Sequence, residues 1–396
     1  MVQLEAIRLQ RDSDTPLYRQ LRDEVVRLID SFDLAPGTKL PPTRELASKL
    51  GINRNTAASA YEELTRSGHV RSHVGRGTFV SETTVSVASP IRFRFSRAVE
   101  ASAERVRPIS PSLAGHSHPV DFASLVPDEE LFPIEPFRRV LDGVLRTEGK
   151  RLLQYGPAAG FPPLRAYIAE RPRRRGVEAD AENVLIVNGS QQALDLICRT
   201  LLDPGDRVAI ESPTYTIVLP LLAQYQAEIE AIPMTERGLD LDALETVLER
   251  FRPKLIFTMP TFQNPTGITM DLPSRKRLLE LAARHATPVV EDDFDSELRF
   301  DGDEVPSLKA LDERESVLHI GTFSKGLFPG LRLGWIVAPR PVVSTLSRSK
   351  LVSDYHTSLL LQAAVVEFCR RGHYDRHLKR LAGIYREKSR KLTGAL

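Results

Sequence analysis

The sequence predicts two domains of different architecture, a small N-terminal helix-turn-helix domain and a larger C-terminal α/β domain with a mainly parallel sheet. Residues 1–80 form short amphipathic segments separated by turns that contain Gly and Pro. From about Asp121 onward, short apolar runs alternate with segments whose apolar residues have helical spacing. Such alternation favours a parallel sheet covered by helices. The length of 396 residues fits two or three domains.

The composition narrows the functional classes. Hydrophobic residues make up 41% and charged residues 27% of the chain, and no apolar run reaches the roughly 18 residues of a membrane-spanning helix. The two cysteines, Cys198 and Cys369, exclude a disulfide framework and a cysteine-rich zinc site, so we expect no metal. The N-terminus lacks the apolar core of a signal peptide, which favours a reduced, cytoplasmic location without membrane contact. Because the net charge is only +2, any nucleic-acid-binding surface must be local.

The N-terminal domain is expected to contain three helices and a two-stranded wing. Residues 17–31 place apolar side chains on one stripe, and the turn-rich segment 34–43 must end that helix. A second, short helix over 44–50 and a third over 54–68 are separated by a tight turn that contains Gly. Residues 69–80 are then predicted to form the two-stranded hairpin of the wing, with a Gly-Arg-Gly sequence in its turn. This arrangement is a helix-turn-helix followed by a wing.

The third helix begins with residues that can recognise base edges. A recognition helix contacts DNA bases with its N-terminal residues, where Arg can bridge guanine and Asn can bridge adenine. Arg at the start of the preceding helix and the Gly and Arg residues of the wing suit phosphate or groove contacts. A small helical adaptor with scattered surface arginines is the alternative. The predicted DNA-contacting residues are Arg44, Asn53, Arg54, Asn55, Thr56, Gly75 and Arg76.

The rest of the chain divides into a linker and the α/β domain. Residues 81–120 are rich in Ser, Pro and Arg and have no sustained period, so they read as a linker between domains 10–80 and 121–396. The basic run 171–176 is interpreted as a solvated helix end rather than a nucleic-acid-binding patch. The expected strands are 184–188, 207–211, 254–260, 287–293, 316–324 and 333–338, and the expected helices are 190–202, 239–251 and 272–285.

Polar residues follow several of these strands, at the sheet edge where α/β proteins bind ligands. Lys325 stands beside Ser324 and seven residues before Arg332, which suits a Schiff base to an aldehyde cofactor that carries a phosphate. Taken alone, such a lysine is usually a surface residue. Asp292 and Asp293 follow another strand, where a carboxylate can keep a pyridine nitrogen protonated. Acidic residues at a strand end are equally compatible with a metal site or a solvated loop.

Three further turns can contribute to the same site. Asn264 precedes a proline in a turn, and such a turn can present the asparagine amide as a donor to a phenolate oxygen. The alternative is an ordinary turn without a role in binding. Ser190 and the backbone amides of Gln191 and the next residue begin a helix after a strand, which suits phosphate. Tyr215 follows another strand and can stack on a flat ring.

The N-terminal motifs together resemble the winged-helix domain of the GntR family of transcription regulators. They are P-x-x-R-E-L-A, R-x-T-x-x-x-A-Y-x-x-L and G-R-G-T-F-V, all within residues 15–80. The resemblance implies binding to double-stranded DNA. Asn53 and Asn55 depart from the Ser or Thr and the Thr that the family often has on either side of Arg54, so the operator sequence does not carry over.

The motifs of the larger domain resemble the aminotransferase fold of pyridoxal phosphate enzymes, fold type I. This resemblance implies that Lys325 forms the Schiff base, that Asp292 pairs with the pyridine nitrogen and that Asn264 bonds the phenolate oxygen. It also implies that Tyr215 stacks on the ring and that Tyr155 reaches the site of a neighbouring subunit. The phosphate would be held by Ser190, Gln191, Ser324 and Arg332, with Thr322 a weaker contributor.

The fusion of the two domains resembles the MocR subfamily of bacterial regulators, which implies a domain-swapped homodimer. Two features depart from the pattern. Phe294 stands where the family often has Tyr, and it cannot hydrogen-bond the cofactor. Aminotransferase domains usually continue beyond the position that corresponds to Leu396, so we expect most of the small C-terminal domain and its substrate-binding arginine to be lacking.

Three functions follow from this organisation. The first is a pyridoxal 5'-phosphate-dependent DNA-binding regulator whose aminotransferase-like domain senses the cofactor, or an amine or amino-acid ligand, with little or no transaminase turnover. The second is an active aminotransferase that carries a DNA-binding module. The third is a truncated regulator with weakened cofactor binding, which an exposed helix surface around 357–396 would favour.

Overall fold

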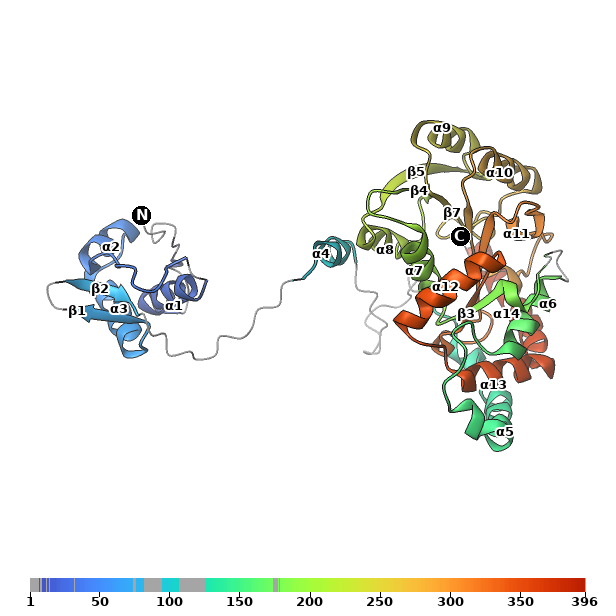
Figure 1. Cartoon of the computed structure of the whole chain (residues 1–396), viewed down its shortest axis with the longest axis horizontal. Coiled ribbons are helices and arrows are strands. Elements are labelled where there is room, and N and C mark those ends of the chain that lie inside the picture. The colour runs from blue at the N-terminus through green and yellow to red at the C-terminus, as the bar shows by residue number, and fades with distance from the viewer. Residues whose placement is uncertain are drawn as a thin grey trace. The chain divides into compact units, whose positions relative to one another are not determined.

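The computed structural model of the chain (Figure 1) divides into two units, Met1–Arg94 and Phe95–Leu396. Among the described residues, none of the helices combines the length and the apolar character needed to span a lipid bilayer. The residues that the structure describes are 7, 9–11, 13, 15–31, 33–73, 76–81, 95–106, 125–173, 177 and 179–395, except for the side chains of 172 and 173.

The N-terminal unit contains three helices and an antiparallel hairpin, in the order that the sequence predicts. The two strands pair from Val70 opposite Val80 to His73 opposite Gly77, and Lys39 adds a bridge to Phe79. The elements are α1 (Leu17–Asp30), α2 (Thr43–Leu50), α3 (Arg54–Arg66), β1 (Val70–His73) and β2 (Gly77–Val80).

Local sequence signals explain where the two helices of the helix-turn-helix end and begin. Gly51 ends α2 in the left-handed region, with a φ of +63°, which glycine adopts at little cost. Asn53 begins α3, since its side chain accepts a hydrogen bond of 2.8 Å from the backbone N–H of Asn55. The apolar stripe of α1, represented by Leu21 and Val25, is fully buried against the other two helices.

The larger unit is built on an eight-stranded sheet with the order β3-β10-β9-β8-β7-β4-β5-β6. The neighbours β9, β8, β7, β4 and β5 are parallel, whereas β10 runs antiparallel to both β9 and β3, and β6 runs antiparallel to β5. The mainly parallel sheet is therefore confirmed. The strands are β3 (Val184–Val187), β4 (Arg207–Ser212), β5 (Glu228–Thr235), β6 (Gly238–Leu239), β7 (Leu255–Thr258), β8 (Val289–Asp293), β9 (Val317–Thr322) and β10 (Gly334–Val337).

All six strands expected from the sequence are present, and two further strands lie at one edge of the sheet. The stretch 228–235 alternates in burial and has only one fully buried residue, Ile232, so it lacks the continuous apolar run of a central strand. The short strand β6 is the last in the sheet order and pairs only with β5. Edge position therefore explains why these two strands give a weak signal in the sequence.

Helices cover both faces of the sheet, and each expected helix is present. In Figure 1, α5 and α13 lie side by side in one layer, and α9 and α10 lie side by side at the other end of the unit. The helices are α4 (Arg97–Ala103), α5 (Ile134–Leu152), α6 (Pro162–Arg173), α7 (Ser190–Leu201), α8 (Val218–Gln224), α9 (Leu241–Phe251), α10 (Leu272–Arg284), α11 (Leu308–Leu311), α12 (Arg340–Ser353), α13 (Leu359–Arg370) and α14 (His373–Ala395).

The central strands are buried on both faces, and their alternation assigns each side chain to one face. In β3, Leu185 and Val187 pack with α7, whereas Val184 and Ile186 pack with α5, α6 and α13. In β8, Val290 belongs to the α7 face and Val289 to the opposite face. This alternation decides which polar residues at the strand ends can meet.

The segment predicted as a linker, 81–120, contains one described element. The helix α4 packs against α8, and its first turn is capped by Ser96, whose hydroxyl accepts a hydrogen bond of 3.3 Å from the N–H of Val99. The sequence prediction of a segment without regular structure missed this helix, because seven residues are too few to show a helical period. Most of the rest of 81–120 lies outside the described residues.

Candidate functional site

The predicted cofactor residues lie at one edge of the sheet, although they come from distant parts of the sequence. The strands β3, β4, β7, β8 and β9 end at this edge because they run in the same direction. The antiparallel strand β10 begins there, with Gly334 opposite Val187 of β3 and Thr322 of β9. The structure thus brings together Ser190, Gln191, Tyr215, Asn264, Asp292, Thr322, Ser324, Lys325 and Arg332.

The strand β8 ends with two aspartates that face opposite sides of the sheet. Asp292 alternates with Asp293 and shares the α7 face with Val290. The Asp292 side chain is 3% exposed, and its Oδ1 has no hydrogen-bond partner among the described residues. Burial, reinforced by the neighbouring Asp293 carboxyl, raises the pKa of Asp292 to about 7. A buried carboxylate oxygen without a partner is rare in native proteins and marks a place for an N–H donor.

The turn between β3 and α7, the first residues of α7 and the guanidinium of Arg332 lie together, and we call this group the phosphate cup. Gly189 has a φ of +82° and precedes Ser190, the first residue of α7. A Cβ atom at Gly189 would lie 2.5 Å from Nη2 of Arg332, so only glycine permits the close approach of this guanidinium. Arg332 donates a hydrogen bond of 3.3 Å from Nη2 to the carbonyl oxygen of Asn188. A helix N-terminus beside a fixed cation suits phosphate.

Two hydroxyl groups lie between β9 and the predicted Schiff-base lysine. Thr322 Oγ1 is 2.9 Å from Ser324 Oγ, accepts from the N–H of Ser324 at 3.1 Å and donates to the carbonyl oxygen of Leu333 at 3.2 Å. The hydroxyl of Thr322 is thus buried and hydrogen-bonded to other protein groups, whereas Ser324 is half-buried. This geometry makes Thr322 the residue that orients Ser324 rather than a free ligand.

Lys325 lies close to the chain segment that enters the larger domain. Its Nζ donates a hydrogen bond of 2.6 Å to the carbonyl oxygen of Leu125. Burial lowers the pKa of Lys325, and the nearby carboxyl of Asp295 partly opposes this effect. A lowered pKa increases the neutral fraction of the amine, which is the nucleophilic form.

The predicted ring-binding residues, Tyr215 and Asn264, lie on two loops. Burial raises the pKa of Tyr215, the charge of Asp292 raises it further, and the charge of Arg332 lowers it. The phenol therefore lies near both charged residues of the predicted site. Asn264 is half-buried in the loop after β7.

A buried glutamate that sequence reasoning missed ties these two loops together. Glu211 at the end of β4 is 1% exposed and accepts hydrogen bonds from the N–H of Met259 at 2.9 Å and from Nε2 of Gln263 at 3.0 Å. Gln263 also donates from Nε2 to the carbonyl oxygen of Pro213 at 2.8 Å. Gln263 directly precedes Asn264, so this network fixes the loop that presents it. The sequence signal that could have revealed Glu211 is a carboxyl residue within the otherwise apolar strand 207–211, RVAIE.

The predicted DNA-contacting residues gather around the start of α3. Arg44, Arg54 and Asn55 are exposed, and Thr56 is half-buried. Asn53 is exposed, but its Oδ1 caps α3, so it cannot make a two-bond contact with adenine without losing the cap. In the wing, Arg76 is exposed, and Gly75 lies outside the described residues.

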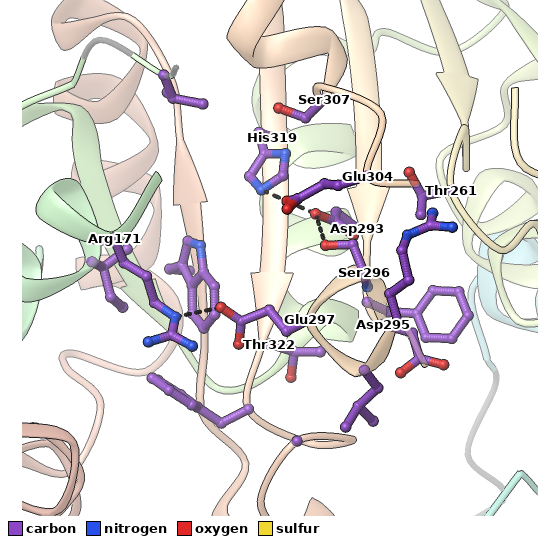
Figure 2. A pocket seen from close by; sticks show the side chains of 18 of the residues that line it. Arg171, Thr261, Asp293, Asp295, Ser296, Glu297, Glu304, Ser307, His319 and Thr322 are labelled. Atoms are coloured by element: carbon purple, nitrogen blue, oxygen red, sulfur yellow. Dashed lines mark hydrogen bonds and ion pairs between the residues drawn. The ribbon is translucent and has the colours of Figure 1, made fainter. Parts of the chain in front are cut away.

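A separate cavity of about 70 Å³ lies next to the cofactor edge on the opposite face of the sheet (Figure 2). Figure 2 shows Asp293 and His319 together in this cavity. Of the predicted cofactor residues that the structure describes, only Thr322 lines it. At its rim, Arg171 pairs with Glu297 and, at 2.8 Å, with Asp375. The interpretation of this basic run as solvated is therefore wrong for Arg171.

Comparisons with known proteins match both parts of the chain. Residues 17–80 match the model of bacterial regulatory proteins of the gntR family, and residues 128–396 match that of aminotransferase class I and II. The probable rhizopine catabolism regulatory protein MocR of Rhizobium meliloti is 37% identical over 96% of this chain and 77% of its own length. The HTH-type transcriptional regulator TauR of Rhodobacter capsulatus is 34% identical over 96% of this chain and 79% of its own length.

These relatives match both units of the chain in one continuous alignment. The chain is a MocR-type member of the GntR family. Its larger domain also matches solved aminotransferases, among them the α-aminoadipate aminotransferase LysN of Thermus thermophilus, crystallised with N-(5'-phosphopyridoxyl)-L-leucine. LysN is 40% identical, with a TM-score of 0.66 over 69% of this chain and 70% of its own. The MocR-type chain therefore has a winged helix and a fold type I aminotransferase domain. In the part of the chain described, no group of three or more His, Cys, Asp or Glu side chains could hold a metal ion.

Proposed function

We propose that this chain is a transcription regulator that binds operator DNA through its N-terminal unit and binds pyridoxal 5'-phosphate through its aminotransferase domain. The observation that carries the proposal is the combination of a gntR match at 17–80 and an aminotransferase match at 128–396 in one chain. MocR and TauR, which match the chain over both parts, are described as regulators. A metabolic transaminase has no need of the helix-turn-helix.

The chain's own residues fit the cofactor at both of its polar ends. Asp292 presents an unpartnered oxygen to the pyridine nitrogen, and Asn264 donates an amide N–H to the phenolate oxygen. Tyr215 packs on the ring. The cofactor, when bound, supplies an aldehyde that reacts with amines and a ring that withdraws electrons. Lys325 is the amine to which it attaches.

The phosphate is held by the cup at the start of α7. The first amides of the helix, at Ser190 and Gln191, point out of its N-terminus, and Arg332 supplies a positive charge beside them. Ser324 adds a hydroxyl, which Thr322 orients.

Two contacts connect the cofactor edge with the segment that precedes the domain. Leu125 accepts a hydrogen bond from Lys325, and α4 packs against α8, which begins three residues after Tyr215. Attachment of Lys325 to the cofactor would remove the donor from Leu125, and an amine ligand that took the place of Lys325 on the cofactor would free the donor again. Cofactor state can thus reach the chain that leads to the DNA-binding unit, which is the basis we propose for sensing an amine or amino acid.

An exposed aromatic surface supports a homodimer. Tyr155 is 80% exposed and lies 5.1 Å from the ring of Tyr355, which is itself 52% exposed. Val352 and Leu153 beside them are 87% and 69% exposed. Because monomeric proteins rarely leave such apolar groups together in water, we propose that a second copy covers them, in a domain-swapped arrangement. Light scattering of the wild type and of Tyr155→Asp tests the dimer, which the variant should weaken.

The second candidate function is an active aminotransferase. The 2-aminoadipate transaminase of Thermus thermophilus is 41% identical over 70% of this chain, and the predicted lysine, aspartate and asparagine all lie at the cofactor edge. This likeness covers the larger domain alone. The alternative of weakened cofactor binding gains no support from 357–395, where Leu392 is the only large apolar residue among those described that is exposed.

One experiment separates these functions. An absorbance scan of the purified protein with pyridoxal 5'-phosphate reports cofactor binding, and amino acids added one at a time then report ligand class. A regulator gives a saturable spectral change and altered binding to DNA, whereas an aminotransferase that is also given a 2-keto acid as amino-group acceptor forms a new amino acid continuously. A protein whose spectrum does not change on cofactor addition would contradict the proposal.

Selection from randomised duplexes supplies a DNA probe for the N-terminal unit. Arg54→Ala should weaken binding to the selected duplex by about 1–3 kcal/mol, because a bidentate contact to a base is lost. Arg66→Ala, at the other end of the same helix, is the matched control and should bind like the wild type. Equal binding by the Arg54 variant and the wild type would remove Arg54 from the recognition surface.

A further inference from the structure

A buried ion pair lies behind the phosphate cup, on a helix that sequence reasoning did not connect with the site. Lys350 and Asp354 are one turn apart at the end of α12, with Nζ 2.6 and 2.7 Å from the two carboxylate oxygens. The side chain of Lys350 is 0% exposed. Burial lowers the pKa of Lys350, and the hydrogen bond to Asp354 opposes this effect. The lysine of the pair is thus enclosed, whereas the side chain of Asp354 is 22% exposed.

The carboxylate of Asp354 extends this pair to the turn that precedes α7. Its Oδ2 accepts hydrogen bonds from the side-chain amide of Asn188 and, at 2.7 Å, from Nε2 of Gln192. Gln192 in turn accepts at Oε1 from the backbone N–H of Asn188 at 2.7 Å. The carbonyl oxygen of Asn188 accepts from Arg332. A continuous chain of hydrogen bonds therefore runs from the buried lysine to the guanidinium of the cup.

Asn188 is held at three of its polar groups by this network. Its backbone N–H, its side-chain amide and its carbonyl oxygen each have a partner. The next residue is Gly189, whose backbone turns the chain into α7, so the direction of the first helical amides depends on the position of Asn188. The network therefore fixes both components of the cup, the helix N-terminus and Arg332.

Stability alone does not account for a buried ion pair at this place. Removing a charge such as that of Lys350 from water costs several kcal/mol, and apolar replacements of buried pairs are often neutral or stabilising. The six hydrogen bonds of this network, three of which Asn188 makes, instead provide geometry, which is what an anion site requires. Leucine and valine side chains would pack α12 against α7 equally well without orienting Asn188.

We propose that Lys350 and Asp354 are positioning residues for the cofactor phosphate, and that they act through Asn188 and Gln192 on the α7 N-terminus and on Arg332. This inference rests on the proposed binding of pyridoxal 5'-phosphate. It goes beyond that proposal because it makes recognition of the phosphate, and not of the ring, depend on the buried pair. Its consequence is a preference for the phosphorylated cofactor over pyridoxal, which has the same ring and aldehyde.

The test compares the dissociation constants of pyridoxal 5'-phosphate and pyridoxal, each measured by absorbance titration of the full chain. The variant carries Lys350→Met and Asp354→Asn together, so that no single charge is left buried. We expect its affinity for pyridoxal 5'-phosphate to fall about tenfold or more, since hydrogen bonds to a charged group are disturbed, and its affinity for pyridoxal to stay within about twofold. Lys309→Met is the matched control, because that lysine pairs with Asp312 at 2.8 Å before β9 begins, away from the cup.

The outcomes are distinct from those that test the cofactor itself. Equal losses for both ligands would show a structural role only and would overturn the inference, as would an unchanged affinity for the phosphorylated ligand. A wild type that binds neither ligand would overturn the proposed function instead. Should the double variant not fold, Gln192→Leu provides the same comparison, because it removes the acceptor for the Asn188 N–H and leaves the ion pair in place. A loss confined to the phosphorylated ligand in either variant supports the inference.

Discussion

The two faces of the sheet at the ends of β8 and β9 hold similar polar residues in opposite states. On the α7 face, Asp292 is buried with an oxygen that lacks a partner in the described structure. On the other face, Asp293 accepts from the N–H and hydroxyl of Ser296, and Glu291 pairs with His319 at 3.0 Å. Asp293 and Glu291 thus have protein partners and Asp292 Oδ1 has none among the described residues, as is also true of Asp295 Oδ1 and Trp335 Nε1 on the other face.

An unpartnered buried atom alone therefore does not distinguish the two faces. The cavity of Figure 2 is lined by Asp295 and Trp335, whose Oδ1 and Nε1 atoms lack a partner among the described residues. The α7 face differs because its unpartnered carboxylate lies at the same sheet edge as a helix N-terminus and the exposed cation Arg332. Because unsatisfied buried groups cost free energy, a carboxylate without a partner beside groups that suit phosphate is a better indicator of this cofactor than space alone.

The largest expected effect comes from Lys325. Lys325→Ala should abolish the near-visible absorbance of the lysine-bound cofactor, since no other amine is predicted to attach it, and should spare DNA binding at saturating protein. His319→Gln, on the opposite face, is the control and should retain the absorbance. An alanine variant that keeps the absorbance would show that the attachment site is wrong.

The next test replaces one aspartate on each face of the sheet by asparagine. Asp292→Asn should weaken binding of pyridoxal 5'-phosphate about ten- to a hundredfold, which corresponds to the loss of a charge-assisted hydrogen bond of about 1.5–3 kcal/mol. Asp293→Asn should leave the dissociation constant nearly unchanged, because that side chain contacts Ser296 on the other face. Titration by absorbance measures both. Equal effects would mean that alternation along β8 does not decide the role of these residues.

The sequence predicts the difference between the two faces of the sheet only in part. The apolar strands and the residues that follow them are visible in the chain, because β-strand burial and turn chemistry are local properties. The sequence places both aspartates after the same strand, and only the pairing of β8 with its neighbours shows which one faces α7. The choice of Asp292, which family resemblance suggested, thus gains a structural reason.

Long-range partners are the part that the sequence could not predict. Asn188 and Asp354 are 166 residues apart, and each is an ordinary loop or helix-end residue when read alone. Glu211 reaches the loop of Gln263 in the same way, 52 residues away. Their roles depend on the folding of the sheet, which brings distant loops to one edge, and no local pattern encodes such a pairing.

A smaller effect is expected on the stability of the cofactor-free protein. Burial and the neighbouring Asp293 raise the pKa of Asp292 to about 7, above the roughly 3.9 of an unfolded chain. The folded state therefore holds a proton that the unfolded state releases, and stability is lost as the pH rises from about 4 to above 7. Asp292→Asn removes this loss, so it should stabilise the protein by up to about 4 kcal/mol at pH 8 and much less at pH 5. Urea unfolding at the two pH values measures the difference, and a variant that is less stable at pH 8 would contradict the assignment.

The smallest effect belongs to the face opposite α7, where Glu291 and His319 form a hydrogen-bonded pair. Burial lowers the pKa of His319, but the hydrogen bond to Glu291 and the charges of Glu291 and Asp293 together outweigh this effect, so the net pKa is raised. Its contribution to stability is present below the unfolded pKa of about 6.5 and is lost as the pH rises through the higher folded value. His319→Asn should therefore cost about 1–2 kcal/mol at pH 6 and less at high pH, which is opposite in sign to Asp292→Asn. Urea unfolding at both pH values measures the cost. A His319→Asn variant as stable as the wild type at pH 6, or one whose cost grows as the pH rises, would contradict this assignment.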